Sequence, residues 1–275
     1  MPTLRDAARR WLAEERRAVL VEVIEARGSV PREAGTRMLV GATSVEGTIG
    51  GGHLEWKAIA AARNMLSSGA TTPATEHYPL GPALGQCCGG AVTLVYSALE
   101  KETLAQWPLA APRFVLQLYG AGHVGRAIVR ALAPFNVLVD WIDEREEEFD
   151  AARRDAPAPG QAQVRSVCVD AVEAEVRQAP PGAYFLVLTH QHDLDLRITD
   201  AILRRGDFGY LGLIGSKTKK QRFMHRFEQH GIAPKILQRL TCPIGIPGVT
   251  GKEPEVLAAA VVAQLLLVSS NSASA

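Results

Sequence analysis

Two glycine-rich turns and a pair of adjacent cysteines are the parts of this sequence best suited to chemistry. The segment 120–125 (GAGHVG) is a G-x-G-x-x-G motif that follows a predicted strand and opens a predicted helix. In that context Gly120 permits the tight turn, Gly122 lets the backbone approach a pyrophosphate, and Gly125 lets the helix pack closely on the strand. The helix N-terminus adds free N–H groups and partial positive charge, so the turn predicts an anion site.

The residues around this turn suggest which anion it holds. Asp143 stands 18 residues after Gly125, at the end of the next predicted strand. A carboxylate there can bind a ribose diol and repels a 2′-phosphate, which favours NAD over NADP. His123, inside the turn, is unusual for a plain dehydrogenase. The ligand therefore stays open between NAD, another nucleotide, another pyrophosphate-bearing group, and none, because a fold does not fix a function.

Two later strands also end in polar segments. His190 and His192 follow one of them, and Ser216 and Lys217 follow the next. Ligands of open parallel sheets sit beyond the carboxyl ends of the strands. The histidines could act in acid–base chemistry, bind a metal, or be ordinary loop residues. Lysines in the first turn of a helix oppose its dipole, so either a bound phosphate compensates them or the turn is simply solvated.

The vicinal pair Cys87 and Cys88 lies in a glycine-rich loop, LGQCCGG at 84–90. Adjacent cysteines close only a strained ring, so two available thiols are expected rather than a structural bridge. Thiolates suit soft metals and sulfur transfer, which makes this pair the candidate metal ligands. Cys168 and Cys242 are interpreted as structural.

A second glycine-rich turn precedes a predicted helix in the first half of the chain. Gly50, Gly51 and Gly52 lead directly into His53, with Glu55 close behind. The turn is either a further anion cradle or a connection that needs glycine backbone angles.

The elements that must position these residues change in kind along the chain. In the first half we expect helices at 4–17 and 53–67 and strands at 18–26, 36–40, 76–80 and 91–98. Segment 99–112, with two Ala/Trp-Pro steps, is expected to be a linker. In the second half we expect strands at 114–118, 137–142, 164–169, 184–188 and 210–214 and helices at 124–132, 145–154, 194–205, 217–230 and 254–268. This predicts an N-terminal α+β domain at 1–108 and a C-terminal Rossmann-like, doubly wound parallel sheet at 109–275.

Composition limits the class of protein. The 275 residues are 47% hydrophobic and 21% charged, with a net charge of +1, which argues against nucleic acid as the main partner. The longest apolar stretch, 257–268, is too short to span a bilayer as a helix, and the N-terminus lacks a secretory core, so we expect a cytoplasmic protein without a membrane partner.

Together the motifs resemble the xanthine dehydrogenase accessory protein family of XdhC/CoxI type. The resemblance rests on the segments 28–38, 47–55, 84–90, 120–125, 189–195 and 212–219, in family order, and 242–249 also fits. It implies a homodimeric chaperone, rather than a turnover enzyme, that binds the molybdenum cofactor (Mo-molybdopterin). Such a protein holds the cofactor during sulfuration by a cysteine desulfurase and delivers it to the molybdenum subunit of xanthine dehydrogenase or a related hydroxylase. The alternatives are an NAD(H)-dependent oxidoreductase and a thiol or persulfide carrier that never touches pterin.

Overall fold

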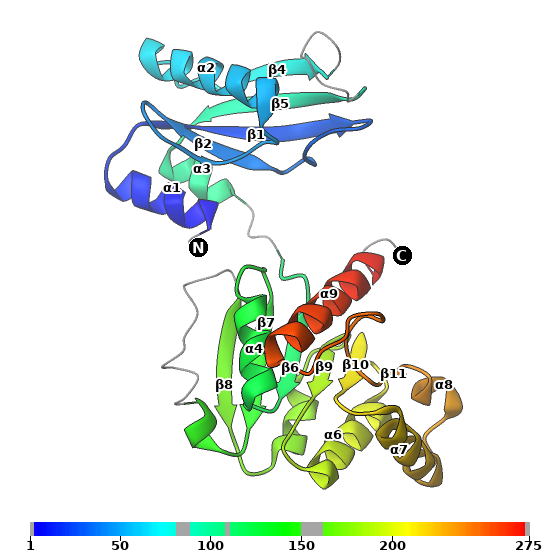
Figure 1. Ribbon diagram of the computed structural model, residues 1–275. Coiled ribbons are helices and arrows are strands. Elements are labelled where there is room, and N and C mark those ends of the chain that lie inside the picture. The colour runs from blue at the N-terminus through cyan, green and yellow to red at the C-terminus, as the bar shows by residue number, and fades with distance from the viewer. Residues whose placement is uncertain (1–2, 81–88, 108–110, 150–161, 273–275) are drawn as a thin grey trace. The chain divides into compact units, whose positions relative to one another are not determined.

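The computed structural model describes residues 3–80, 89–107, 111–149 and 162–272. The chain divides into two compact units, Pro2–Leu109 and Ala110–Ala275. Each unit has its own sheet and its own hydrophobic core (Figure 1).

The N-terminal unit is built on an antiparallel sheet with the order β3-β2-β1-β5-β4. Its strands are β1 (Ala18–Arg27), β2 (Arg37–Gly41), β3 (Val45–Gly47), β4 (Ala74–Pro79) and β5 (Ala91–Ala98). Helix α2 (Gly52–Ser68) covers one face, where its Leu54, Ala58 and Ala62 join the core. Helices α1 (Leu4–Ala13) and α3 (Lys101–Gln106) cover the other face. This is the α+β architecture that the sequence predicts.

Two expectations for this unit are wrong. The first helix ends at Ala13 rather than at residue 17, because Glu15 takes a positive φ of 52° and the chain turns there. The segment expected to be a linker contains α3, which packs on α1, and the N–H of Leu99 bonds to the carbonyl of Ala18. The proline-rich composition concealed this short helix.

The C-terminal unit is a six-stranded parallel sheet with the order β11-β10-β9-β6-β7-β8. Its strands are β6 (Val115–Tyr119), β7 (Leu138–Asp143), β8 (Gln163–Cys168), β9 (Tyr184–Val187), β10 (Tyr210–Leu213) and β11 (Leu240–Thr241). Read from β8, this is the 3-2-1-4-5-6 order of the dinucleotide-binding fold, with its topological switch point between β6 and β9. The predicted Rossmann-like sheet is confirmed; the sequence missed only its short edge strand β11.

Helices cover both faces of this sheet (Figure 1). Helices α4 (His123–Leu132) and α9 (Pro254–Ser272) pack on one face. The opposite face carries the 3-10 helix η2 (Val172–Gln178) and helices α6 (His192–Arg205), α7 (Lys217–Gln229) and α8 (Pro234–Leu237). Residues 146–149 are helical, and the rest of the helix expected at 145–154 lies outside the described residues.

Helix α9 is longer than the sequence pattern indicates. By length and composition, its segment Pro254–Asn271 could cross a membrane, so the expectation that this region is too short does not hold. Its Ala258, Val261 and Leu265 are buried against α4 in the core of the C-terminal unit. A core helix can pass the same test; in this helix 33% of the segment is buried, and Leu267 is exposed.

Candidate functional site

The 120–125 turn joins β6 to α4, and two of its glycines are required by packing. A Cβ on Gly120 would lie 2.3 Å from the carbonyl oxygen of Leu188, and one on Gly125 would lie 2.1 Å from that of Gly120. Gly122 differs, because no heavy atom lies within 4 Å of where its Cβ would be and its φ of −69° suits any residue. The space above Gly122 is therefore open to a group that approaches the backbone.

Asp143, predicted to bind a ribose, has both carboxylate oxygens already occupied. Its Oδ2 accepts a hydrogen bond of 2.7 Å from the N–H of Ala121, inside the turn. The guanidinium of Arg145 donates to both oxygens at 2.9 Å, and the Arg145 N–H donates to Oδ1 at 3.0 Å. Asp143 is also only 5% exposed. A ribose diol could reach this carboxylate only by displacing Arg145, so in this structure Asp143 closes the turn instead of facing a ligand.

The charge state of Asp143 follows from these contacts. Burial acts to raise the pKa of the carboxyl, but the hydrogen bonds from Arg145 and Ala121 outweigh it and hold the pKa below its usual value. The same pairing raises the pKa of Arg145. Asp143 is therefore a buried carboxylate that remains charged and fully bonded at neutral pH.

The switch point between β6 and β9 is consequently almost filled. The cavity there, bordered by Gly120, Asp143, Glu144 and His190, has a volume of about 10 Å³. His123 is exposed at the start of α4 and does not border it. Among the described residues, the space directly beside the switch point is therefore small.

A much larger cavity, of about 410 Å³, lies one strand further along the same edge. We call it the β9/β10 cavity, because its walls are the segments that follow these two strands. It brings together the predicted residues His190, His192 and Ser216, whereas Lys217 does not line it. The lining is Thr189, His190, Gln191, His192, Asp195, Ile214, Gly215, Ser216, Thr218, Lys219 and Arg222.

The sequence analysis missed the buried ion pair in the wall of this cavity. Lys219 Nζ donates to Asp195 Oδ2 at 2.5 Å and to the carbonyl of Ile214 at 2.9 Å. Asp195 Oδ1 accepts from the N–H and the hydroxyl of Thr189, at 3.0 and 2.8 Å. The two charged side chains are 9% and 2% exposed. This pair joins α7 to α6 and fixes the turn that carries His190.

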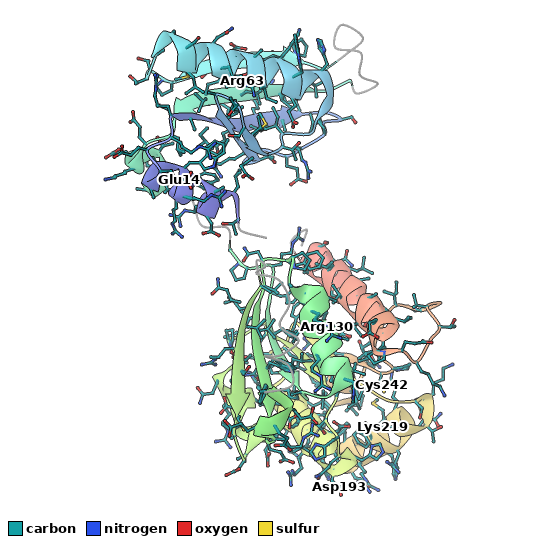
Figure 2. The ribbon with its side chains drawn as sticks, turned by 60° about the vertical axis from the view of Figure 1, so that its left-hand side comes forward. Glu14, Arg63, Arg130, Asp193, Lys219 and Cys242 are labelled. Carbon is teal, nitrogen blue, oxygen red and sulfur yellow. The ribbon has the colours of Figure 1, made fainter. Side chains whose placement is uncertain are left out.

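The two described cysteines differ in their surroundings. Cys242 follows β11 and is buried, with its Sγ 4.0 Å from the carbonyl oxygen of Ser216; Figure 2 labels it with Lys219 in the C-terminal unit. Burial raises the pKa of the Cys242 thiol, although Lys219 acts against the shift. Cys168 is exposed at the end of β8, and desolvation followed by nearby acidic residues raises its pKa. Neither environment favours a thiolate.

In the N-terminal unit, the second glycine-rich turn is occupied by a carboxylate of the chain itself. Glu55 Oε2 accepts from the N–H groups of Ile49 and Gly51, at 3.0 and 3.1 Å, and from the Thr48 hydroxyl at 2.5 Å. The Gly50 N–H donates to Thr48 Oγ1. Backbone N–H groups that the sequence analysis considered as phosphate donors therefore bind the Glu55 carboxylate instead.

Three motifs of this unit meet at one end of its sheet. A Cβ on Gly50 would lie 2.5 Å from Cβ of Pro31, and one on Gly90 would lie 2.4 Å from the carbonyl oxygens of Arg27 and Ser29. The turn after β1 therefore packs against both glycine-rich segments. At the start of α2, His53 stacks on Trp56 with ring centroids 5.6 Å apart, and Trp56 is 65% exposed.

The candidate metal ligands Cys87 and Cys88 lie outside the described residues. Within the part of the chain that the structure describes, no group of three or more His, Cys, Asp or Glu side chains could hold a metal ion. The metal-binding prediction thus stays a prediction.

Comparison with known families explains this combination of units. The model of the XdhC Rossmann domain matches residues 116–265, more than half of the chain, and the model of the XdhC and CoxI family matches residues 11–79. The chain belongs to the XdhC family. The XdhC family is an accessory and maturation family rather than a catalytic one.

Two individual proteins are similar to this XdhC family member. It is 28% identical over 258 residues to the uncharacterized protein YqeB of Escherichia coli (strain K12), a match that covers 92% of this chain and 43% of YqeB. The chain thus spans less than half the length of this curated relative. A Bacillus halodurans crystal structure described as a xanthine dehydrogenase matches with a TM-score of 0.74 and 18% identity, over 97% of this chain and 96% of that one. This second likeness shows a shared fold.

Proposed function

We propose that this chain is a cytoplasmic accessory protein that binds the molybdenum cofactor while a cysteine desulfurase sulfurates it. It then delivers the cofactor to the molybdenum subunit of xanthine dehydrogenase or of a related hydroxylase. The observation that carries this proposal is that both units match XdhC family models. When bound, the cofactor supplies the molybdenum centre of the client enzyme, and the accessory chain supplies only binding and protection.

Three features of the chain suit such a ligand. A pterin cofactor with a phosphate is anionic, and the β9/β10 cavity offers Arg222, Ser216, Thr218 and two helix N-termini to an anion. The open space above Gly122, on the same sheet edge, is not needed for packing. Cys87 and Cys88 supply soft sulfur ligands for molybdenum.

The NAD(H)-dependent oxidoreductase alternative is not favoured by the geometry. Such an enzyme would bind the ribose with the Asp143 carboxylate. Both oxygens of this carboxylate already accept hydrogen bonds from Arg145 or Ala121. Titration of the full chain with NAD⁺ and NADH should therefore give no binding at millimolar concentration, measured by calorimetry. Tight binding with turnover would make the oxidoreductase the better assignment.

The direct test is elemental and pterin analysis of the protein purified from a molybdenum-replete host. The wild-type chain should carry molybdenum and pterin in equal amounts. Cys87→Ala/Cys88→Ala should lose most of the molybdenum while its circular dichroism and Tm stay unchanged. Cys168→Ala removes an exposed thiol of the other unit and should retain the metal.

The other outcomes of this test point elsewhere. Equal molybdenum in the double variant would remove the thiols from the proposal. Reactive thiols with neither molybdenum nor pterin in the wild-type protein would support a persulfide carrier instead.

A further inference from the structure

The β9/β10 cavity lies beyond the carboxyl ends of the fourth and fifth strands of the 3-2-1-4-5-6 order, in the second mononucleotide-binding half of the fold and one strand away from the switch point. The switch point between β6 and β9 keeps only about 10 Å³, whereas this cavity between the ends of β9 and β10 has about 410 Å³. Binding sites for small ligands usually measure about 300–1,000 Å³. The cavity is therefore large enough for a ligand of mononucleotide size.

Two helices begin at this cavity, and both leave backbone donors facing its edge. Helix α6 begins at His192, and its N-cap residue Gln191 makes no side-chain capping bond. Helix α7 begins at Lys217, where the Ser216 hydroxyl accepts only the N–H of Lys219. Each helix is more than three turns long, so each adds the positive end of its dipole.

The side chains around the cavity add positive charge without matching carboxylates. Lys217, Lys220 and Arg222 make no ion pair with any described residue, and Arg222 lines the cavity. Lys219 is 9% exposed in the wall; its Nζ donates to Asp195 and Ile214 and lies 5.3 Å from the centroid of the Phe223 ring.

The carboxylates at this edge are either committed elsewhere or outside the lining. Asp195 lines the cavity but is bound to Lys219 and Thr189. Glu144 lies 3.5 Å from His190 Nε2 and does not line the cavity. Asp193, labelled in Figure 2, is exposed in the first turn of α6 and does not line it either.

We infer that the β9/β10 cavity binds a phosphate monoester dianion. Its phosphate lies between the first turns of α6 and α7, against Arg222, and the rest of the cavity takes the organic part of the ester. The inference rests on the proposed function only for the identity of that ester, which is then the pterin phosphate. The inference places the anion site of this unit at the β9/β10 cavity, whereas the sequence motif predicts an anion site at the 120–125 turn.

The test uses the full chain and inorganic phosphate as the probe, with binding followed by the ³¹P NMR linewidth. Phosphate should bind the wild-type protein, and Arg222→Ala should weaken it about 10- to 100-fold, as expected for loss of a charge-assisted hydrogen bond. Arg226→Ala removes an arginine that is also exposed, one turn further along α7 and outside the lining, and is the matched control. Its affinity should stay within about twofold.

A second variant excludes unfolding as an explanation. Thr218→Glu places a carboxylate in the first turn of α7. There its negative charge interacts favourably with the positive end of the helix dipole, so Tm should not fall. The same carboxylate faces the cavity and should abolish phosphate binding. Absence of phosphate binding to the wild-type chain, or equal weakening by Arg226→Ala, would overturn the inference, as would normal binding by Thr218→Glu.

Molybdenum and pterin content, measured on the same proteins, separates the two proposals. A wild-type chain that binds phosphate at Arg222 but carries no pterin retains the cavity assignment and refutes the proposed function. An Arg222→Ala protein that keeps its full pterin content refutes the assignment of the pterin phosphate to this cavity and leaves the proposed function standing.

Discussion

Replacing Lys219 by methionine should destabilise the C-terminal unit strongly, because it leaves the Asp195 carboxylate buried without its counter-charge. The two charged groups are 2.5 Å apart. At an effective dielectric constant of about 20, their attraction is about 6–7 kcal/mol, which offsets the desolvation of both ions. Removing one partner of such a pair costs about 3–5 kcal/mol. Methionine preserves most of the aliphatic packing, so the loss is electrostatic.

Hydrogen exchange measures the loss of stability of the C-terminal unit separately. A global unfolding curve would combine the unfolding of both units. The amides of Leu186 and Leu211 lie in the central strands β9 and β10, and both residues are fully buried. If they exchange by opening of the whole unit, 3–5 kcal/mol corresponds to exchange about 150 to 5,000 times faster. Lys217→Met, on an exposed lysine of the same turn, should change exchange by less than about threefold.

A double variant tests whether the charge itself is responsible. In Lys219→Met/Asp195→Asn, the amide still accepts from Thr189 and no buried charge is left. This protein should recover at least about 2 kcal/mol relative to Lys219→Met alone, a non-additivity typical of contacting partners. If the effects of the two single substitutions simply add, the ion pair does not hold the two helices together and the reasoning fails.

Three further predictions concern the glycine turns and the carboxylates that close them. Glu55→Ala removes the acceptor of two backbone N–H groups and should lower the unfolding free energy of the N-terminal unit by about 1–3 kcal/mol in urea titrations; unchanged stability would mean that the turn needs no acceptor. Gly125→Ala places a methyl 2.1 Å from the Gly120 carbonyl oxygen and should yield little folded protein, whereas Gly122→Ala should keep the wild-type Tm. The pKa of Asp143 is lowered in the folded state, so its stabilisation is present above its unfolded pKa and is lost as pH falls through the folded value. The stability difference between wild type and Asp143→Asn should therefore shrink in unfolding titrations as the pH falls below about 4, and a constant difference would contradict the pairing with Arg145.

The sequence predicted the parts of the fold that local patterns determine. The alternation of apolar strands and helices after residue 113 predicted the parallel sheet, and the 120–125 motif placed its first turn correctly. The two-residue strand β11 and the short helix α3 carry too few residues for a hydrophobic period, so no pattern could predict them. Strand β11 forms because it pairs with β10, and helix α3 forms because it packs on α1.

The site was predicted less completely than the fold. Its most important contacts join residues that are far apart in the sequence, and no local pattern indicates such contacts. Asp195 and Lys219 are 24 residues apart and meet only when α6 and α7 lie side by side. His190, His192 and Ser216 were identified because each directly follows a strand. Their shared cavity required the strand order, which fixes which strand ends are neighbours.

The two glycine turns show why a glycine motif alone does not identify a ligand site. In each, a carboxylate of the chain accepts backbone N–H groups that an external anion could use: Asp143 binds Ala121, and Glu55 binds Ile49 and Gly51. A carboxylate and a phosphate place the same demand on those donors, so the sequence cannot distinguish an internal anion from an external one. The distinguishing property is whether positive charge nearby lacks a partner. Arg145 is paired with the Asp143 carboxylate. Around the β9/β10 cavity, in contrast, Lys217, Lys220 and Arg222 have no counter-charge among the described residues. A ligand anion is therefore expected at the cavity rather than at either glycine turn.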